Sequence, residues 1–196
     1  MNSTLTIPLF PLKAVLFPGG FLPLRVFEPR YLDMVSDCLK NERGIGVVLI
    51  SEGSETGDAA NTHDIGTLAK IDYWHKRADG LLGVTLSGEQ RFKIIERDIK
   101  SNQLIIAEVE LLPEASEQPV DEEHRLLVDM LQQIISQLEP PFTKLKPDYG
   151  SSNWVSARLV ELLPLELTDK QKLLMMDDVQ KRMHEITGLL HQLDII

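Results

Sequence analysis

The first part of the chain, to about Pro113, has the spacing of apolar and polar positions that indicates β-strands. The apolar run IGVVLI at Ile45–Ile50 predicts a buried strand, and an Asp-Gly pair within Lys76–Gly80 predicts a turn between strands. Further strands are expected at Gly66–Tyr73, Leu81–Leu86, Arg91–Ile95 and Gln103–Leu112, with a break at Gly88–Glu89. Short strands separated by turn signals predict a closed or half-closed barrel.

One helix is expected to interrupt these strands. Within Pro29–Lys40, apolar side chains recur at helical spacing, at Tyr31, Met34, Val35 and Cys38. Proline is favourable at the first position of a helix, so the helix is expected to begin at Pro29.

From about Val120 the apolar positions change to a helical period. A broad apolar stripe is formed by Leu126, Leu127, Met130, Leu131, Ile134, Ile135 and Leu138, and Pro140–Pro141 is expected to end this helix. A shorter helix is expected at Trp154–Leu163, and Thr168 with Gln171 matches a capping box at the start of another. A last helix has apolar residues in four-three spacing, at Val179, Met183, Ile186, Leu190 and Leu193, as in a bundle.

The change of period divides the chain. The polar segment Glu114–Pro119 is the expected linker, which gives a β-barrel lobe with one inserted helix at residues 1–113 and an α-helical lobe at residues 120–196. The fold class is therefore α+β. Residues 1–112 carry 12 basic and 15 acidic side chains, net −3, and residues 113–196 carry 8 and 15, net −7.

Composition narrows the classes of partner. The formal charge of −10 disfavours nucleic acid and anionic membrane surfaces, which both require basic patches. The start of the chain lacks a basic region and contains Pro8 and Pro11, so it does not resemble a signal peptide. No apolar run is long enough for a transmembrane helix, and the single cysteine, Cys38, permits no internal disulfide. We expect a cytoplasmic protein, and the sequence does not predict its oligomeric state.

Residues 7–31, IPLFPLKAVLFPGGFLPLRVFEPRY, resemble the opening signature of the amino-terminal, substrate-recognition domain of Lon proteases. The shared features are a PLFPL strand, a PGG turn, a basic residue before an IFE-like triplet, and PRY. Later segments agree, among them IGTLA at residues 65–69, GEQRF at residues 88–92 and LLPLELTDKQKLL at residues 162–174. The resemblance implies a PUA-like β pseudo-barrel followed by a C-terminal helical bundle, in a stand-alone form of the domain.

The resemblance also implies a function. Lon proteases continue into an ATPase and a serine–lysine peptidase, whereas this sequence has no GxxxxGK[ST] phosphate-binding loop. We therefore expect a non-enzymatic polypeptide-binding or adaptor domain whose partners are unfolded or specific polypeptides. Two alternatives stay open: an RNA-binding module, because PUA-like barrels include RNA binders, and a small-molecule enzyme.

Candidate binding residues come mainly from the signature. Phe17 and Phe21 flank the PGG turn and would form an interaction site if exposed, or close one end of the barrel if they point inward. Arg25, Glu28 and Arg30 are expected to form an ion-pair cluster that holds the helix to the barrel, with direct ligand contact as the alternative. The complete set of binding candidates is Phe17, Phe21, Arg25, Glu28, Arg30 and Trp74.

No catalytic residue, metal site or cofactor is expected. His63, Asp64, Asp72 and His75 match no zinc spacing. His184 and His191 share a helix face but have no third ligand at helical spacing. Cys38 lies on the apolar face of its helix, where a buried and inert thiol is the expected state.

Overall fold

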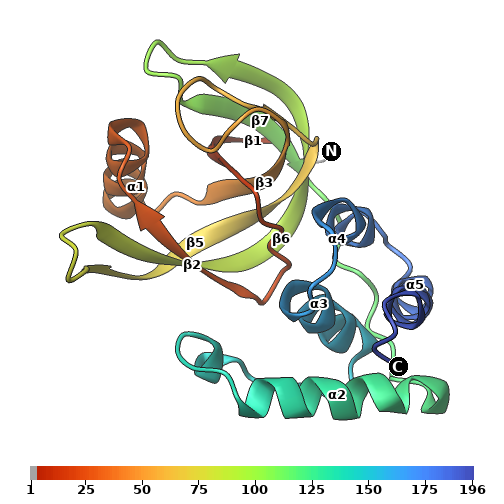
Figure 1. Cartoon of the computed structure of the whole chain (residues 1–196). Helices are drawn as coiled ribbons and strands as arrows, with labels where there is room; N and C mark the ends of the chain where they lie inside the picture. Colours follow the sequence, from red (N-terminus) through yellow and green to blue (C-terminus); the bar gives the residue numbers. More distant parts are fainter. Residues whose placement is uncertain (1–3) are drawn as a thin grey trace. The chain divides into compact units, whose positions relative to one another are not determined.

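The computed structural model describes residues 4–196. The chain forms two compact units, Met1–Pro113 and Glu114–Ile196, the first rich in strands and the second helical (Figure 1). The helices within the described residues are too short or too polar to cross a lipid bilayer.

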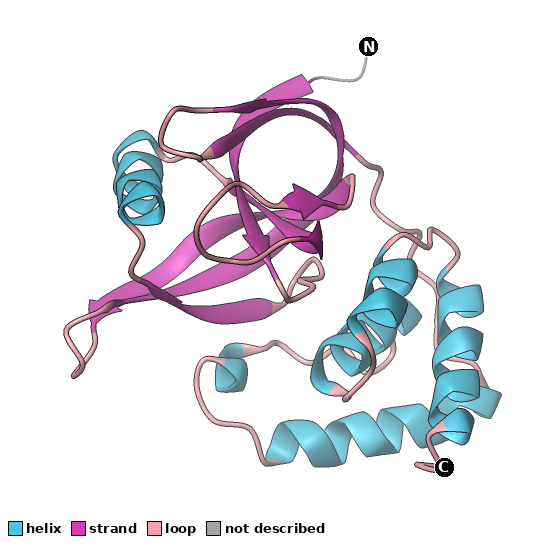
Figure 2. Ribbon diagram, turned by 45° about the horizontal axis from the view of Figure 1, so that its top comes forward, coloured by secondary structure: helices cyan, strands magenta, loops and turns pink. Residues whose placement is uncertain are grey.

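The strands of the first unit form a closed ring. Their order is β1-β7-β6-β5-β3, and β1 returns to pair in parallel with β3, so the sheet closes on itself (Figure 2). All other pairings are antiparallel, and β4 extends the sheet beyond β3. The strands are β1 Thr4–Leu12, β2 Phe21–Val26, β3 Ile45–Glu52, β4 Asn61–Thr62, β5 Ile65–Lys76, β6 Leu82–Ile99 and β7 Ile105–Leu111.

Strand β6 is longer than its sequence pattern predicts. The expected break at Gly88–Glu89 is wrong, because β6 runs without interruption from Leu82 to Ile99. Gly88 instead lies where the PGG turn crosses the strand: its N–H donates to the carbonyl of Gly20, and its carbonyl accepts from the N–H of Gly19. A Cβ at position 88 would lie 2.3 Å from the carbonyl oxygen of Phe17, so only glycine permits this approach.

Helix α1, Pro29–Asn41, packs its apolar face against the strands. Tyr31, Met34, Val35 and Cys38 join strand residues in one buried cluster, and the ring of Phe10 stacks on that of Tyr31 at 4.4 Å. A second cluster around Phe92 fills the ring between β1, β3, β6 and β7. The helical periodicity of residues 29–40 therefore identified both the helix and its buried face.

The second unit contains η1 Glu122–His124, α2 Arg125–Ser136, η2 Phe142–Lys144, α3 Ser152–Leu162, α4 Leu167–Leu174 and α5 Val179–Gln192. Helix α3 contacts α2, α4 and α5 and lies at the centre of the unit. Two of these helices have side-chain caps: Ser151 accepts from the N–H of Trp154, and Asp178 accepts from that of Lys181.

Two predictions for this unit are wrong in detail. Helix α4 begins after Glu166 and has no side-chain cap, so Thr168 and Gln171 form no capping box, and Gln171 is buried instead. The apolar stripe of α2 is also narrower than expected, because Leu127 and Leu131 are buried whereas Leu126 is exposed. Apolar identity alone does not distinguish these adjacent leucines.

Candidate functional site

A hollow of about 310 Å³ opens on the β unit beside strand β2. Its wall is mainly apolar, and its polar groups come from the end of β2 and from the segment that follows β3. This size is at the lower end for ligand pockets in proteins. The lining residues are Phe10, Leu12, Pro23, Leu24, Arg25, Val26, Phe27, Glu28, Tyr31, Glu55 and Thr56.

The hollow lies along one edge of β2. Successive residues of a strand point to opposite faces, yet the last four residues of β2, 23–26, all line the hollow, and residues 27 and 28 continue the run. Such a run is expected where a cavity follows the edge of a strand rather than one face. Within residues 4–196, β2 pairs with β6 alone, so its second edge has no partner strand.

Arg30 is buried and contacts two residues that line the hollow, Glu28 and Tyr31. Its Nη1 donates to the carbonyl of Gln103 at 3.0 Å, and its Nη2 lies 3.2 Å from Oε2 of Glu28. The guanidinium also lies over the ring of Tyr31, 4.6 Å from its centre. Burial raises the pKa of Tyr31, and the charge of Arg30 partly opposes that rise. Arg30 thus joins the start of α1 to the turn before β7.

Arg25 does not belong to this network, so a single cluster of Arg25, Glu28 and Arg30 is a wrong prediction. The exposed Arg25 guanidinium lies 2.7 Å from Oδ2 of Asp79, in the turn between β5 and β6. The hydrogen bond from Arg25 is the main cause that lowers the pKa of Asp79 to about 2. Arg25 therefore remains at the rim of the hollow, where its stem lines the wall.

The segment between β3 and β4 closes one side of the hollow. The N–H of Lys13 donates to Oε1 of Glu55 at 2.6 Å, and the N–H of Gly57 donates to Oε2 of Glu28 at 3.4 Å. These bonds hold Glu55 and Thr56 against the hollow. They also occupy both carboxylates, Glu28 and Glu55, that line it.

The aromatic candidates are placed differently from one another. Phe17 is 1% exposed and Phe21 is half-buried, so Phe17 packs in the interior and the exposed alternative for it is wrong. Trp74 is exposed on β5 and does not line the hollow; beside it, the rings of Tyr73 and His75 stack at 5.3 Å. Among the candidates, Arg25 and Glu28 line the hollow and Arg30 contacts Glu28. The lining does not include Phe17, Phe21 or Trp74.

Phe27 is an exposed aromatic side chain at this site that the sequence did not identify as a binding candidate. It is 54% exposed and belongs to the signature triplet Val26-Phe27-Glu28. The triplet was visible in the sequence, but a single exposed phenylalanine between a buried valine and a helix start has no periodic signal. Its exposure depends on how the chain leaves β2 for α1.

Residues considered for metal binding in the β unit remain separate. Asp64 pairs with Arg97, and His75 stacks on Tyr73. Within the described part of the chain, His63, Asp64, Asp72 and His75 form no group of three potential metal ligands.

Cys38 is buried and lies on the inner face of α1, as expected. Burial is the main cause that raises the pKa of its thiol to about 11, and Asp37 adds to the rise. The thiol is therefore protonated and shielded at neutral pH, which is the state of an inert structural cysteine.

Comparison with known proteins places the chain in a family. The sequence profile of the ATP-dependent protease La (LON) substrate-binding domain matches residues 6–192. A Lon protease from Cytophaga hutchinsonii is 28% identical over 96% of this chain, and one from Buchnera aphidicola is 26% identical over 100% of it. The chain spans about a quarter of the length of these curated relatives, 24% and 26%.

Solved structures agree. A Lon N-terminal domain protein from Xanthomonas campestris is 33% identical, with a TM-score of 0.77, covering 94% of this chain and 98% of that one. The N-terminal domain of a Mycobacterium avium complex Lon protease shares the fold, with 16% identity, a TM-score of 0.62, and coverage of 93% and 96%. The chain belongs to the family of LON substrate-binding domains.

Proposed function

We propose that this domain binds polypeptides non-covalently, by placing an apolar segment in the hollow beside β2. The observation that carries the proposal is the hollow itself, because its apolar wall is built from the residues of the family signature. Partners are unfolded chains or specific proteins that expose such a segment.

The composition of the hollow supports a peptide ligand. Leu24, Val26 and Phe27 offer apolar contact, while Arg25 carries a positive charge at the rim. Exposed apolar surface bordered by polar groups is typical of protein interaction sites. A peptide side chain that covers Phe27 would remove from water an aromatic surface that is now half exposed.

The open edge of β2 supports an extended conformation for the bound segment. An unpaired strand edge can add a further strand through main-chain hydrogen bonds, while adjacent pockets select side chains. Pro23 removes one backbone donor from β2, so the main-chain contacts are expected from the other residues of the strand. We propose that the segment makes main-chain contacts along β2 and inserts one apolar side chain into the hollow.

Binding without catalysis is part of the same proposal. The carboxylates of Glu28 and Glu55 already have partners. Among the residues that line the hollow, Thr56 is the one serine or threonine. The net charge of −3 over residues 1–112 disfavours RNA as the ligand of this unit.

A binding titration tests the proposal. A fluorescently labelled, carboxymethylated protein that cannot refold is titrated with the chain, and then with Phe27→Asp. Burying a phenylalanine side chain contributes about 1.5–3 kcal/mol, so Phe27→Asp is expected to weaken binding by at least about tenfold.

Ile99→Asp is the matched control, because Ile99 is an exposed apolar residue of the same unit that does not line the hollow. It is expected to bind as the parent chain does. No binding at high micromolar concentration, or equal losses in both variants, would count against the hollow. If polypeptide binding were lost in Trp74→Ala alone, the binding site would lie on β5 instead.

A further inference from the structure

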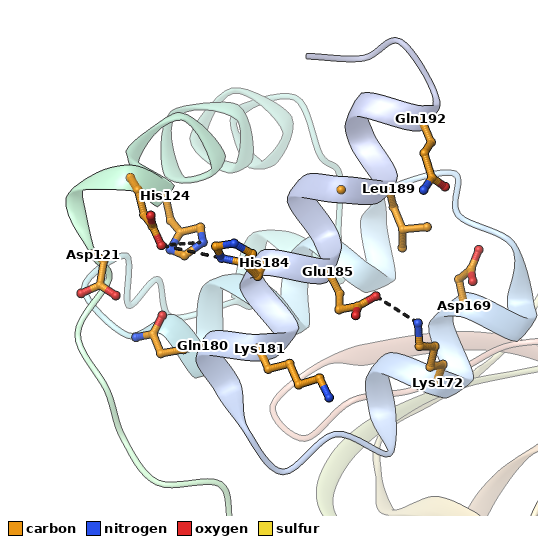
Figure 3. A pocket seen from close by; sticks show the side chains of 12 residues that line it. Asp121, His124, Asp169, Lys172, Gln180, Lys181, His184, Glu185, Leu189 and Gln192 are labelled. Atoms are coloured by element: carbon orange, nitrogen blue, oxygen red, sulfur yellow. Dashed lines mark hydrogen bonds and ion pairs between the residues drawn. The ribbon is translucent and has the colours of Figure 1, made fainter.

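Three potential metal ligands meet in the helical unit. Glu123 and His124 are adjacent in η1, and His184 lies on α5. Oε1 of Glu123 lies 3.7 Å from Nε2 of His124 and 3.7 Å from Nδ1 of His184, and the three ligand atoms all lie within 4.8 Å of one another. Figure 3 shows the two histidine rings close together between η1 and α5, where they meet edge to face with their centroids 5.8 Å apart.

His124 is the unusual member of this group. It is 3% exposed, and its Nδ1 has no hydrogen-bond partner among the residues that the structure describes. Its Nε2 is 3.7 Å from the nearest carboxylate oxygen, which is too long for a hydrogen bond. Within the described part of the chain, Nδ1 is therefore the buried atom without a partner, whereas Nε2 is the atom on the Glu123 side that would bind a cation.

The distances suit a cation between the three groups. Zn²⁺ binds imidazole nitrogen and carboxylate oxygen at about 2.0–2.2 Å, which separates neighbouring ligands by roughly 3.4 Å in a tetrahedron. The two observed separations of 3.7 Å are close to that value. His184 is 75% exposed and can adjust its ring, whereas His124 is fixed by packing.

The surroundings leave room for an exchangeable ligand. His124, His184 and Glu123 line a surface hollow of about 750 Å³, which also contains Asp121, Gln180 and Lys181. A site with three protein ligands completes its tetrahedron with water or another small donor, and this hollow is open to such a molecule (Figure 3).

We propose that Glu123, His124 and His184 form a binding site for a divalent transition-metal ion, Zn²⁺ or a close analogue such as Co²⁺. Two imidazoles and one carboxylate favour these ions over Mg²⁺ or Ca²⁺, which prefer ligand sets made of oxygen alone. The bound ion joins η1 to α5 and thereby fixes the start of the helical unit. The site lies in a different unit from the proposed polypeptide site and does not depend on it.

The sequence predicts no metal site here, because His184 has only His191 as a possible partner on the same face of its own helix. The third ligand comes from another element, and Glu123 and His124 are far from His184 in the chain. Spacing along one helix carries no information about that contact.

Direct titration tests the site. The full chain, without an affinity tag, is titrated with Zn²⁺ by calorimetry, and with Co²⁺ by visible absorption, which reports tetrahedral coordination. One equivalent is expected to bind, and Zn²⁺ is expected to raise the melting temperature, because a ligand of the folded state stabilises that state.

The variants His184→Gln and Glu123→Gln each remove one ligand at an exposed position. Each is expected to weaken Zn²⁺ binding by at least about tenfold, because loss of even an outer partner of a metal ligand costs about 10- to 100-fold. His191→Gln is the matched control, since it removes an exposed histidine of the same helix that is not part of the group. It is expected to bind Zn²⁺ as the parent chain does.

The result that overturns the proposal is a parent chain that binds no Zn²⁺ at micromolar concentration, or binding that survives in both His184→Gln and Glu123→Gln. Equal weakening by His191→Gln would show non-specific histidine binding and would overturn it as well. None of these outcomes decides whether the parent chain binds polypeptides, which the separate binding titration measures.

Discussion

Two arginines of the signature have opposite environments. Arg30 is buried, with its guanidinium shared between Glu28 and the carbonyl of Gln103. Arg25 is exposed and pairs with Asp79 across the rim of the hollow. Removing one partner of a buried charge pair is strongly destabilising, whereas an exposed pair contributes little to stability. The first arginine therefore supports the fold, and the second is available to a ligand.

Paired substitutions separate these roles. Arg30→Met is expected to lower the free energy of unfolding by about 2–4 kcal/mol, because it leaves Glu28 and the Gln103 carbonyl without their partner. Arg25→Met is expected to change stability little and to weaken polypeptide binding. Denaturant unfolding measures the first effect and the binding titration the second. Equal destabilisation by both variants would contradict this assignment.

The buried thiol of Cys38 gives a pH dependence with a defined sign. Its pKa is raised from 9.0 to about 11 in the folded chain. Between these values the unfolded state loses the thiol proton and the folded state keeps it, so the free energy of unfolding falls as pH rises, by roughly 2–3 kcal/mol in total. Cys38→Ala is expected to lack this component. Identical pH profiles of the two chains between pH 8 and 11 would refute it.

At the scale of elements, β6 joins most of the β unit. It pairs with β2 and β5 over its first half and with β5 and β7 over its second. Gly88 lies between these halves and receives the PGG turn. The signature turn is therefore attached to the middle of the longest strand among residues 4–196.

Two glycine-to-alanine substitutions are expected to have opposite signs. Gly88→Ala places a Cβ 2.3 Å from the carbonyl oxygen of Phe17, which forces the turn away from β6 and is expected to lower stability by about 2 kcal/mol or more. Gly188→Ala, within α5, meets nothing within 4 Å and is expected to raise stability by about 0.5–1 kcal/mol. Thermal or denaturant unfolding measures both. A stable Gly88→Ala would show that the turn moves freely.

The helices and strands could be predicted from the sequence more fully than the residues that line the hollow. Periodicity identified α1 and its buried face, because one helix has to cover one side of the sheet. The same pattern wrongly predicted a strand break at Gly88, because glycine is also common in turns. It did not identify Phe27 or Glu55 as neighbours, because the hollow brings together β2 and a segment after β3 that are distant in the chain.

At the scale of the whole molecule, the β unit contains its own complete core. The strand ring closes within residues 4–113, and both of its buried clusters lie there. A fragment of residues 1–113 is therefore expected to fold without the helical unit. Circular dichroism and a cooperative thermal transition would check this, and a fragment that melts without cooperativity would contradict it.

The central claim is that the hollow beside β2 holds an apolar segment of a polypeptide. The most direct measurement is a methyl-NMR titration of the full chain with a carboxymethylated, unfolded protein. The account predicts that the shifted methyl groups gather around the hollow, at Leu12, Leu24 and Val26, and that Phe27→Asp abolishes these shifts. Saturable binding with unchanged signals at all three residues, or no binding at high micromolar concentration, would contradict it.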